Sequence, residues 1–161
     1  MKKPILFVAL LLNLFILSAD ARQGGPFGLG VVLGDPTGLS MKYWTSRENA
    51  VSAALAFGTF HHHYDNYYYN DETDVYLHVN YLWHNFGLLP VQRGQLPVYW
   101  GAGGRLYFGH DFALGVRGCG GLEYLPVAPI DIFLELGLVI DFMGNHPGAD
   151  GDLGIGIRYF F

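Results

Sequence analysis

The sequence predicts an all-β fold, specifically an eight-stranded antiparallel up-and-down transmembrane β-barrel. Two observations lead to this prediction. Apolar side chains recur at every second residue through eight successive segments, which is the period of a β-strand. After residue 21, no uncharged apolar run approaches the ~18 residues of a membrane helix. If this part of the chain crosses a membrane, it therefore crosses as strands.

The first 21 residues are expected to form a signal peptide, and residues 22–161 the barrel domain. The chain begins with MKK, continues with the apolar run PILFVALLLNLFIL and reaches a small-residue cleavage pattern at residues 19–21. A membrane-anchoring helix is the rival interpretation, but the apolar run is short for one. No Cys follows the run, which argues against a lipid-anchored N-terminus.

The first four strands are separated by turn-forming residues or by a longer polar stretch. They are expected at residues 27–34, 39–45, 50–63 and 74–86. DPTG and SREN supply turn residues after the first and second segments. In the third segment Val51, Leu55 and Phe57 share one face, whereas Ser52 and Ala54 lie on the other.

The last four strands follow the same pattern, with GHD and PVAP as turns after the fifth and sixth. They are expected at residues 98–109, 112–125, 130–142 and 152–161. One face of the seventh segment is entirely apolar and consists of Ile130, Ile132, Leu134, Leu136, Leu138, Ile140 and Phe142. The opposite face carries Asp131, Phe133, Glu135, Gly137, Val139 and Asp141.

Each segment has one apolar face and, on its other side, a second face. The composition of this second face decides which of the two points outward. This face is built from Gly, Ala and Ser with a few charges, so it would be a poor solvent shell for a soluble barrel. It is a good filling for a narrow barrel, in which small side chains leave room for a few long ones. The apolar face then points at lipid, and closure of the barrel leaves no strand edge unpaired in the bilayer.

The long charged side chains of the second face are expected to pair inside the barrel, because an unpaired buried charge is costly. They are Lys42, Arg105, Arg117, Glu123, Glu135 and Arg158. An ion pathway is the functional alternative. An eight-stranded barrel is only wide enough to be filled by side chains, so we expect a structural plug.

With both chain ends in the periplasm, the first segment runs outward and two aromatic belts emerge. Tyr43, Trp83 and Trp100 fall near the periplasmic rim, and Phe57 and Phe108 near the outer rim. Trp44 is next to Tyr43 in the same strand, so alternation of the side chains directs it inward.

The stretch HHHYDNYYYNDE continues the third segment and is expected at the cell surface. Its tyrosines suit a recognition surface or contact with lipopolysaccharide, and they are Tyr64, Tyr67, Tyr68 and Tyr69. His61, His63 and Asp65 share one face, and imidazole with carboxylate can bind zinc or copper. A plain polar rim is the alternative interpretation of these three residues.

Composition excludes several function classes. The formal net charge of −5 gives no electrostatic footprint for nucleic acid. Cys119 is the single cysteine, so no internal disulfide forms, and we expect it to be a packed interior residue. No catalytic residue and no cofactor is predicted. A lipid A-modifying enzyme would need a serine beside a base at the outer rim, where only Ser40 is expected.

The chain ends with GIGIRYFF, which continues the strand period to the last residue. Gly156, Tyr159 and Phe161 resemble the C-terminal assembly signal of bacterial outer-membrane barrels. Gly154 stands where that signal usually has a polar residue. The resemblance implies that the last strand contacts the barrel-assembly machinery.

Residues 22–161 also resemble the small eight-stranded outer-membrane barrels of the OmpA and OmpX type. The stretch GLGVVLGDPTGLSMKYW is similar to the opening of a group of uncharacterised bacterial small barrels with a G-D/E-P-T-G-L-S turn. The resemblance implies a place in the cell outer membrane of a Gram-negative bacterium, among its lipid and lipopolysaccharide. It transfers no catalytic residues.

The function expected from the sequence is that of a structural or interaction protein, not an enzyme, whose surface loops are available to a partner. Two alternatives stay open. One is a lipid A-modifying enzyme of the outer membrane. The other is a secreted soluble barrel with an apolar ligand cavity inside.

Overall fold

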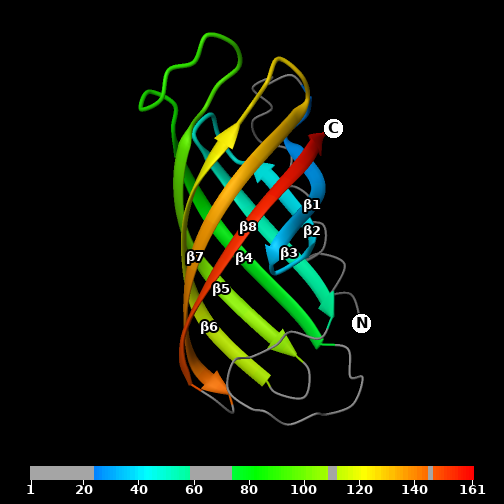
Figure 1. Ribbon diagram of the computed structural model, residues 1–161, viewed down its shortest axis with the longest axis vertical. Coiled ribbons are helices and arrows are strands. Elements are labelled where there is room, and N and C mark those ends of the chain that lie inside the picture. The colour runs from blue at the N-terminus through cyan, green and yellow to red at the C-terminus, as the bar shows by residue number, and fades with distance from the viewer. Residues whose placement is uncertain (1–23, 59–73, 109–111, 145–146) are drawn as a thin grey trace, which may run out of the picture.

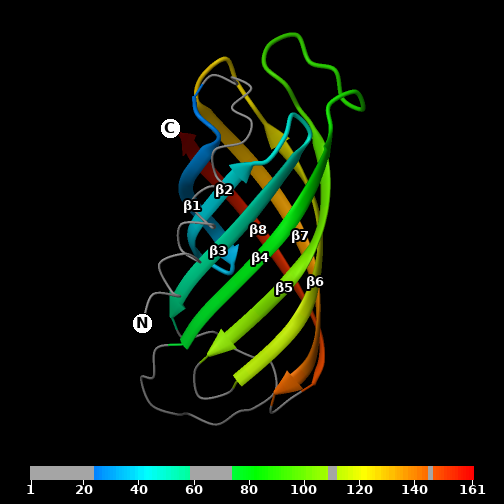
Figure 2. The ribbon, with the colours of Figure 1, turned by 180° about the vertical axis from the view of Figure 1, so that it is seen from behind.

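The computed structural model describes residues 24–58, 74–108, 112–144 and 147–161, and it confirms the predicted fold class. The strands are β1 (Phe27–Asp35), β2 (Gly38–Trp44), β3 (Asn49–Gly58), β4 (Asp74–Asn85), β5 (Val98–Phe108), β6 (Phe112–Tyr124), β7 (Ile130–Gly144) and β8 (Gly148–Phe160). Each strand pairs antiparallel with the next, and β8 pairs with β1 (Figures 1 and 2). Among the described residues, no helix is long and apolar enough to cross a membrane.

Closure of the barrel depends on a continuous register between its first and last strands. Leu29 lies opposite Tyr159 and Val31 opposite Ile157 in the β1–β8 pair. The pairing extends from Gly28 to Asp35 on β1, so nearly all of that strand contributes. Because every strand has two neighbours, the backbone groups along the paired part of the wall are satisfied within the wall itself.

The apolar face of the strands is the outer face. Leu138, in the middle of β7, is 73% exposed, and its neighbours at alternate positions are exposed as well. The charged residues between them, such as Asp131 and Glu135, are buried. This is the reverse of a soluble barrel, in which the apolar residues would be inside.

Aromatic residues gather at both ends of the barrel. We call the end at which β1 begins and β8 ends the proximal end, and the opposite end the distal end. Exposed aromatic residues near the proximal end are Phe27, Tyr81, Trp83, Trp100, Tyr159 and Phe161, and those near the distal end are Phe57, Phe108, Phe112 and Phe142. Trp44 is buried inside the barrel instead. The two belts lie where a bilayer would place its interfaces.

The structure differs from the sequence prediction at several strand ends. β8 begins at Gly148 instead of residue 152, and β7 runs to Gly144 instead of residue 142. The added residues of β8 pair with β7, as Gly148 lies opposite Asp141, whereas those of β7 pair with β6, as Met143 lies opposite Leu114. A segment as rich in glycine as GADGD hides the alternation on which the prediction depended. Residues 59–63, predicted as part of the third strand, lie outside the described residues.

The β1–β2 hairpin is much shorter than the hairpin of β7 and β8. Its turn is closed by Thr37, whose hydroxyl accepts a hydrogen bond from Gly34 N (3.0 Å) and donates one to Gly34 O (2.8 Å). On β8 the pairing with β1 ends at Leu153, opposite Asp35, although β8 starts at Gly148. The hairpin therefore stops well short of the distal ends of β7 and β8 (Figure 1).

Leu138→Arg tests the position of the bilayer. A charge at the midplane should lower the free energy of unfolding by about 2–4 kcal/mol, against about 0–1 kcal/mol for Phe142→Arg near the distal rim. Urea-induced unfolding in lipid vesicles, followed by tryptophan fluorescence, measures both values. Leu138→Ala separates the cost of the charge from the loss of the side chain. Equal losses at positions 138 and 142 would contradict a midplane at the middle of β7.

Candidate functional site

The barrel interior is the candidate site, because it gathers ionisable residues from β2 and from each of the strands β4 to β8. Three tiers of ion pairs follow one another along the barrel. The proximal tier contains Lys42, His84, Glu123, Asp131 and Arg158; the middle tier contains Arg117, Glu135 and Asp152; and the distal tier contains Arg105, Asp141 and Asp150. All of these residues except Asp150 are buried.

The proximal tier is centred on Lys42 and Glu123, which are 1% and 0% exposed. Lys42 Nζ donates to Glu123 Oε1 at 2.5 Å and to Oε2 at 2.6 Å. Nζ also lies 2.9 Å from His84 Nε2 and 3.9 Å from the centroid of the Trp44 ring. The ammonium is thus enclosed by a carboxylate, an imidazole and an aromatic face, each of which favours a cation.

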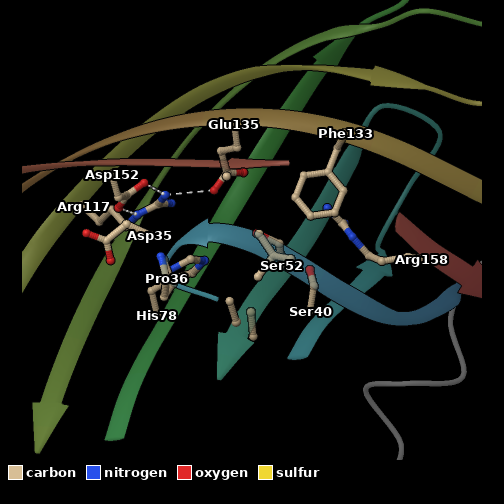
Figure 3. Close-up of a pocket in the computed structure, with 14 residues that line it drawn as sticks. Asp35, Pro36, Ser40, Ser52, His78, Arg117, Phe133, Glu135, Asp152 and Arg158 are labelled. Carbon is tan, nitrogen blue, oxygen red and sulfur yellow. Dashed lines mark hydrogen bonds and ion pairs between the residues drawn. The ribbon is translucent and has the colours of Figure 1, made fainter. Parts of the chain in front are cut away.

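Arg158 and Asp131 complete the proximal tier with looser geometry. Arg158 Nη1 lies 3.6 Å from Asp131 Oδ2. The guanidinium lies over the Phe133 ring, with its central carbon 3.8 Å from the ring centroid. Figure 3 shows this side chain extending along the ring. The guanidinium of Arg158 is therefore held by a cation–π contact with Phe133 as well as by its long ion pair with Asp131.

The middle tier is organised by the guanidinium of Arg117. Nε donates to Asp152 Oδ2 at 2.7 Å, Nη2 pairs with Asp152 Oδ1, and Nη2 lies 2.9 Å from Glu135 Oε1 (Figure 3). The Tyr99 hydroxyl donates to the other oxygen of Glu135 at 2.9 Å. A Cβ at Gly137 would overlap Arg117 and Asp152, so this glycine provides the space that the pair occupies.

The distal tier repeats this arrangement with Arg105. Its Nε donates to Asp141 Oδ1 at 3.3 Å, and Nη2 pairs with Asp141 Oδ2. Nη1 donates to Asp150 Oδ2 at 3.1 Å. The bidentate geometry fixes the orientation of the planar group as well as its charge.

Apolar side chains close the interior beyond the tiers. At the proximal end Trp44, Ala50 and Phe160 form a cluster against which Phe86 and Leu125 pack. Towards the distal end Ala56, Tyr76 and Tyr107 form another. The proximal and middle tiers thus lie between two apolar clusters, whereas Asp150 of the distal tier is exposed. A buried charge pair needs good geometry because its charges are cut off from water.

A small polar cavity lies beneath the β1–β2 hairpin. It is lined by residues of the middle tier together with Ser40, Ser52, His78 and Pro36 (Figure 3). Its space for the centres of water molecules is ≈ 20 Å³, which is enough for about one or two waters. Within the described part of the chain, Ser52 Oγ and Arg117 Nη1 are buried without a hydrogen-bond partner. Water is the usual partner of such groups.

The six charges predicted from the sequence all lie inside the barrel, and the structure pairs Lys42 with Glu123 and Arg117 with Glu135. Arg105 and Arg158 have partners outside that set. The residues that the sequence analysis did not include in the network are His84, Asp131, Asp141, Asp150 and Asp152. Strand alternation places all of these except Asp150 on the inward face, so the signal for His84, Asp131, Asp141 and Asp152 was present in the sequence.

The C-terminal residues Gly156, Tyr159 and Phe161 lie on and just beyond β8. A Cβ at Gly156 would overlap the Phe133 ring, so this inward position requires a glycine. Tyr159 and Phe161 point outward, with their ring centroids 5.0 Å apart. The two rings belong to the proximal belt.

Several predicted positions lie outside the described residues. They are the histidine and carboxylate group His61, His63 and Asp65 and the tyrosines Tyr64, Tyr67, Tyr68 and Tyr69. In the described part of the chain, no group of three His, Cys, Asp or Glu residues is placed to hold a metal ion. Ser40, the serine considered for an enzyme, is buried in the wall of the polar cavity.

Comparison with known proteins gives matches at the level of solved structures. No protein-family model and no curated protein matches the chain. The chain is similar to the crystal structure of Neisserial surface protein A, with 13% identity, coverage of 84% of this chain and 93% of that one, and a TM-score of 0.54. Ail, the attachment invasion locus protein of Yersinia pestis, matches with 15% identity, coverage of 83% and 92%, and a TM-score of 0.42. The likeness to Neisserial surface protein A supports the eight-stranded barrel fold.

Lys42→Met tests the proximal tier. Removal of one partner leaves Glu123 buried without its cation, and the free energy of unfolding should fall by about 3–5 kcal/mol. Urea-induced unfolding in vesicles measures the loss. Lys42→Met/Glu123→Gln removes both charges, and it should lose less than the sum of the two single variants. Strictly additive losses would show that the two side chains contribute independently.

Proposed function

We propose that this chain is an integral protein of the bacterial outer membrane, that its barrel is a membrane anchor, and that its surface loops carry its specific work. One observation carries the proposal. A continuous apolar outer face encloses an interior in which the charges are paired and the ends are filled. Such an exterior is suited to lipid, and the described side chains fill the interior, so the barrel serves as an anchor and not as a channel.

The closed interior favours an anchor over an ion pathway. Trp44 and Phe160 pack together at the proximal end, next to the buried pair of Lys42 and Glu123. An ion would have to displace both the aromatic cluster and a fully desolvated ion pair. Specific function then falls to the parts of the chain that extend beyond the two aromatic belts, since loops carried on a rigid scaffold are the usual place for recognition.

The loops of the distal end are the proposed working surface. β1 begins and β8 ends at the proximal end, which we assign to the periplasm, so the distal ends of β3 and β4 lead to the cell surface. The tyrosine-rich segment between these strands would bind an extracellular partner or lie against lipopolysaccharide. Gly156, Tyr159 and Phe161 of the last strand would contact the barrel-assembly machinery. Neisserial surface protein A, which has a similar fold, is by its name a surface protein.

Gel mobility of residues 22–161, refolded in detergent, tests the anchor. A closed barrel held by interstrand hydrogen bonds around its whole circumference should keep its fold in cold dodecyl sulfate and lose it on heating. The unboiled and boiled samples should therefore migrate differently. Identical migration, together with solubility in the absence of detergent, would overturn the proposal and favour a soluble barrel.

A peptide tag tests the orientation. A tag inserted between Tyr68 and Tyr69 should be accessible to an antibody on intact cells. A matched tag inserted after Gln92, at the proximal end, should be accessible only after the outer membrane is permeabilised. The opposite pattern would place the tyrosine-rich segment in the periplasm and remove it as an extracellular binding surface.

A further inference from the structure

Residues 86–97, which join β4 to β5 at the proximal end, form the longest connection that the structure describes. Figures 1 and 2 show this loop rising beyond the other turns of that end and bending away from the barrel. Periplasmic turns of transmembrane barrels are usually short, because they need only reverse the chain. A long loop on this side therefore calls for a physical reason.

The side chains of the loop are unusual for a segment surrounded by water. Leu88 is 55% exposed, Leu89 40% and Val91 41%. The loop FGLLPVQRGQLP contains no Asp or Glu, although the chain carries a formal net charge of −5, and its one charged residue is Arg93. Three exposed aliphatic residues beside a lone cation are the composition of a segment that meets a membrane surface.

The loop is held in place, so this exposure is a property of its fold. Gln95 and Leu125 exchange two backbone hydrogen bonds of 2.8 Å, which tie the loop to the turn between β6 and β7. The Tyr124 hydroxyl donates to Arg93 O at 3.4 Å. Phe86 packs on the apolar cluster that closes the barrel, whereas the aliphatic side chains that follow it do not share this burial.

The loop also continues directly from the membrane belt. Trp83 precedes it on β4, Trp100 follows it on β5, and the two residues lie opposite each other in the strand register. Both indole side chains are exposed on the outer face of the barrel. Because tryptophan marks the membrane interface, the loop leaves the barrel at the level of the lipid headgroups.

We propose that the loop of residues 86–97 is an interfacial membrane anchor, in which Leu88, Leu89 and Val91 insert into the adjacent phospholipid leaflet and Arg93 contacts lipid phosphate. The proposal rests on the membrane-spanning barrel proposed above. A phospholipid surface is preferred over a protein partner because the loop continues the tryptophan belt and lacks acidic residues, as a contact with anionic headgroups requires. The loop then attaches one side of the barrel to the leaflet beyond its own wall.

Fluorescence quenching in liposomes tests this contact. In a Cys119→Ala background, single cysteines replace Leu88, Leu138 or Glu48, and each is labelled with an environment-sensitive fluorophore. The proteins are reconstituted into phosphatidylcholine and phosphatidylglycerol vesicles with or without brominated acyl chains. The label at position 88 should emit at shorter wavelength than the label at 48, and brominated lipid should quench it several-fold more strongly. Iodide in the buffer should quench the label at 48 more strongly.

The control position 138 distinguishes a failure of the loop anchor from a failure of the membrane-spanning barrel. Leu138 is at the middle of β7 and must be quenched by brominated lipid if the barrel spans the bilayer, with Leu136→Cys as its replacement if labelling at 138 prevents folding. Quenching at 138 with an aqueous signal at 88 overturns the anchor alone. An aqueous signal at both positions overturns the membrane-spanning barrel. A label at 88 that is aqueous in vesicles and becomes protected only when periplasmic proteins are added also overturns the anchor, in favour of a protein partner.

Leu89→Ser/Val91→Ser provides an independent check in the same liposomes. This double variant leaves the barrel wall unchanged but removes two of the three inserting side chains. Quenching by brominated lipid at position 88 should fall towards the level at 48, whereas quenching at 138 should not change. Unchanged quenching at 88 would contradict insertion through these residues.

Discussion

Backbone hydrogen bonding in a medium without water is the constraint on which the rest of this structure depends. A strand in hydrocarbon must pair on both sides, and the pairing of β8 with β1 meets that requirement by joining the two ends of the sheet. Closure with eight strands then limits the width of the interior. The small inward-facing residues, such as Gly137 and Gly156, follow from this limit, since a Cβ at either position would overlap a neighbouring side chain.

The same narrow interior dictates how the charged residues are arranged. A long cationic side chain that enters the barrel loses most of its contact with water, so its partners must come from other strands of the wall. Arg117 of β6 meets Glu135 of β7 and Asp152 of β8, and Arg105 of β5 reaches across to Asp141 of β7. The pairs Arg117–Asp152 and Arg105–Asp141 each skip one strand of the wall, and such pairs specify the packing of the interior as hydrophobic residues do in a soluble core.

The sequence predicted the fold and the direction of the side chains well, because a period of two carries both. Parity alone placed Glu123, Glu135 and the buried Trp44 correctly inside. Partner choice was harder to predict, since it depends on the stagger between strands and on side-chain reach across the barrel. Asp150 was not considered because its strand was expected to begin at residue 152, and GADGD gives no alternation to reveal the earlier start. The polar cavity depends on the short β1–β2 hairpin. The turn residues DPTG predict that hairpin, but they do not predict how far along the barrel axis it extends.

That short hairpin has a consequence for the surrounding lipid. β1 and β2 contain 9 and 7 residues, whereas β7 contains 15 and carries exposed apolar side chains as far as Phe142 and Met143, so the height of the apolar band varies around the circumference. A bilayer adapts to such a mismatch by thinning beside the low side, or the protein adapts by tilting. Lipids next to β1 and β2 would therefore be compressed relative to those next to β7. The barrel would therefore impose an uneven thickness on the surrounding bilayer, and its β1–β2 side would favour thinner or more disordered lipid.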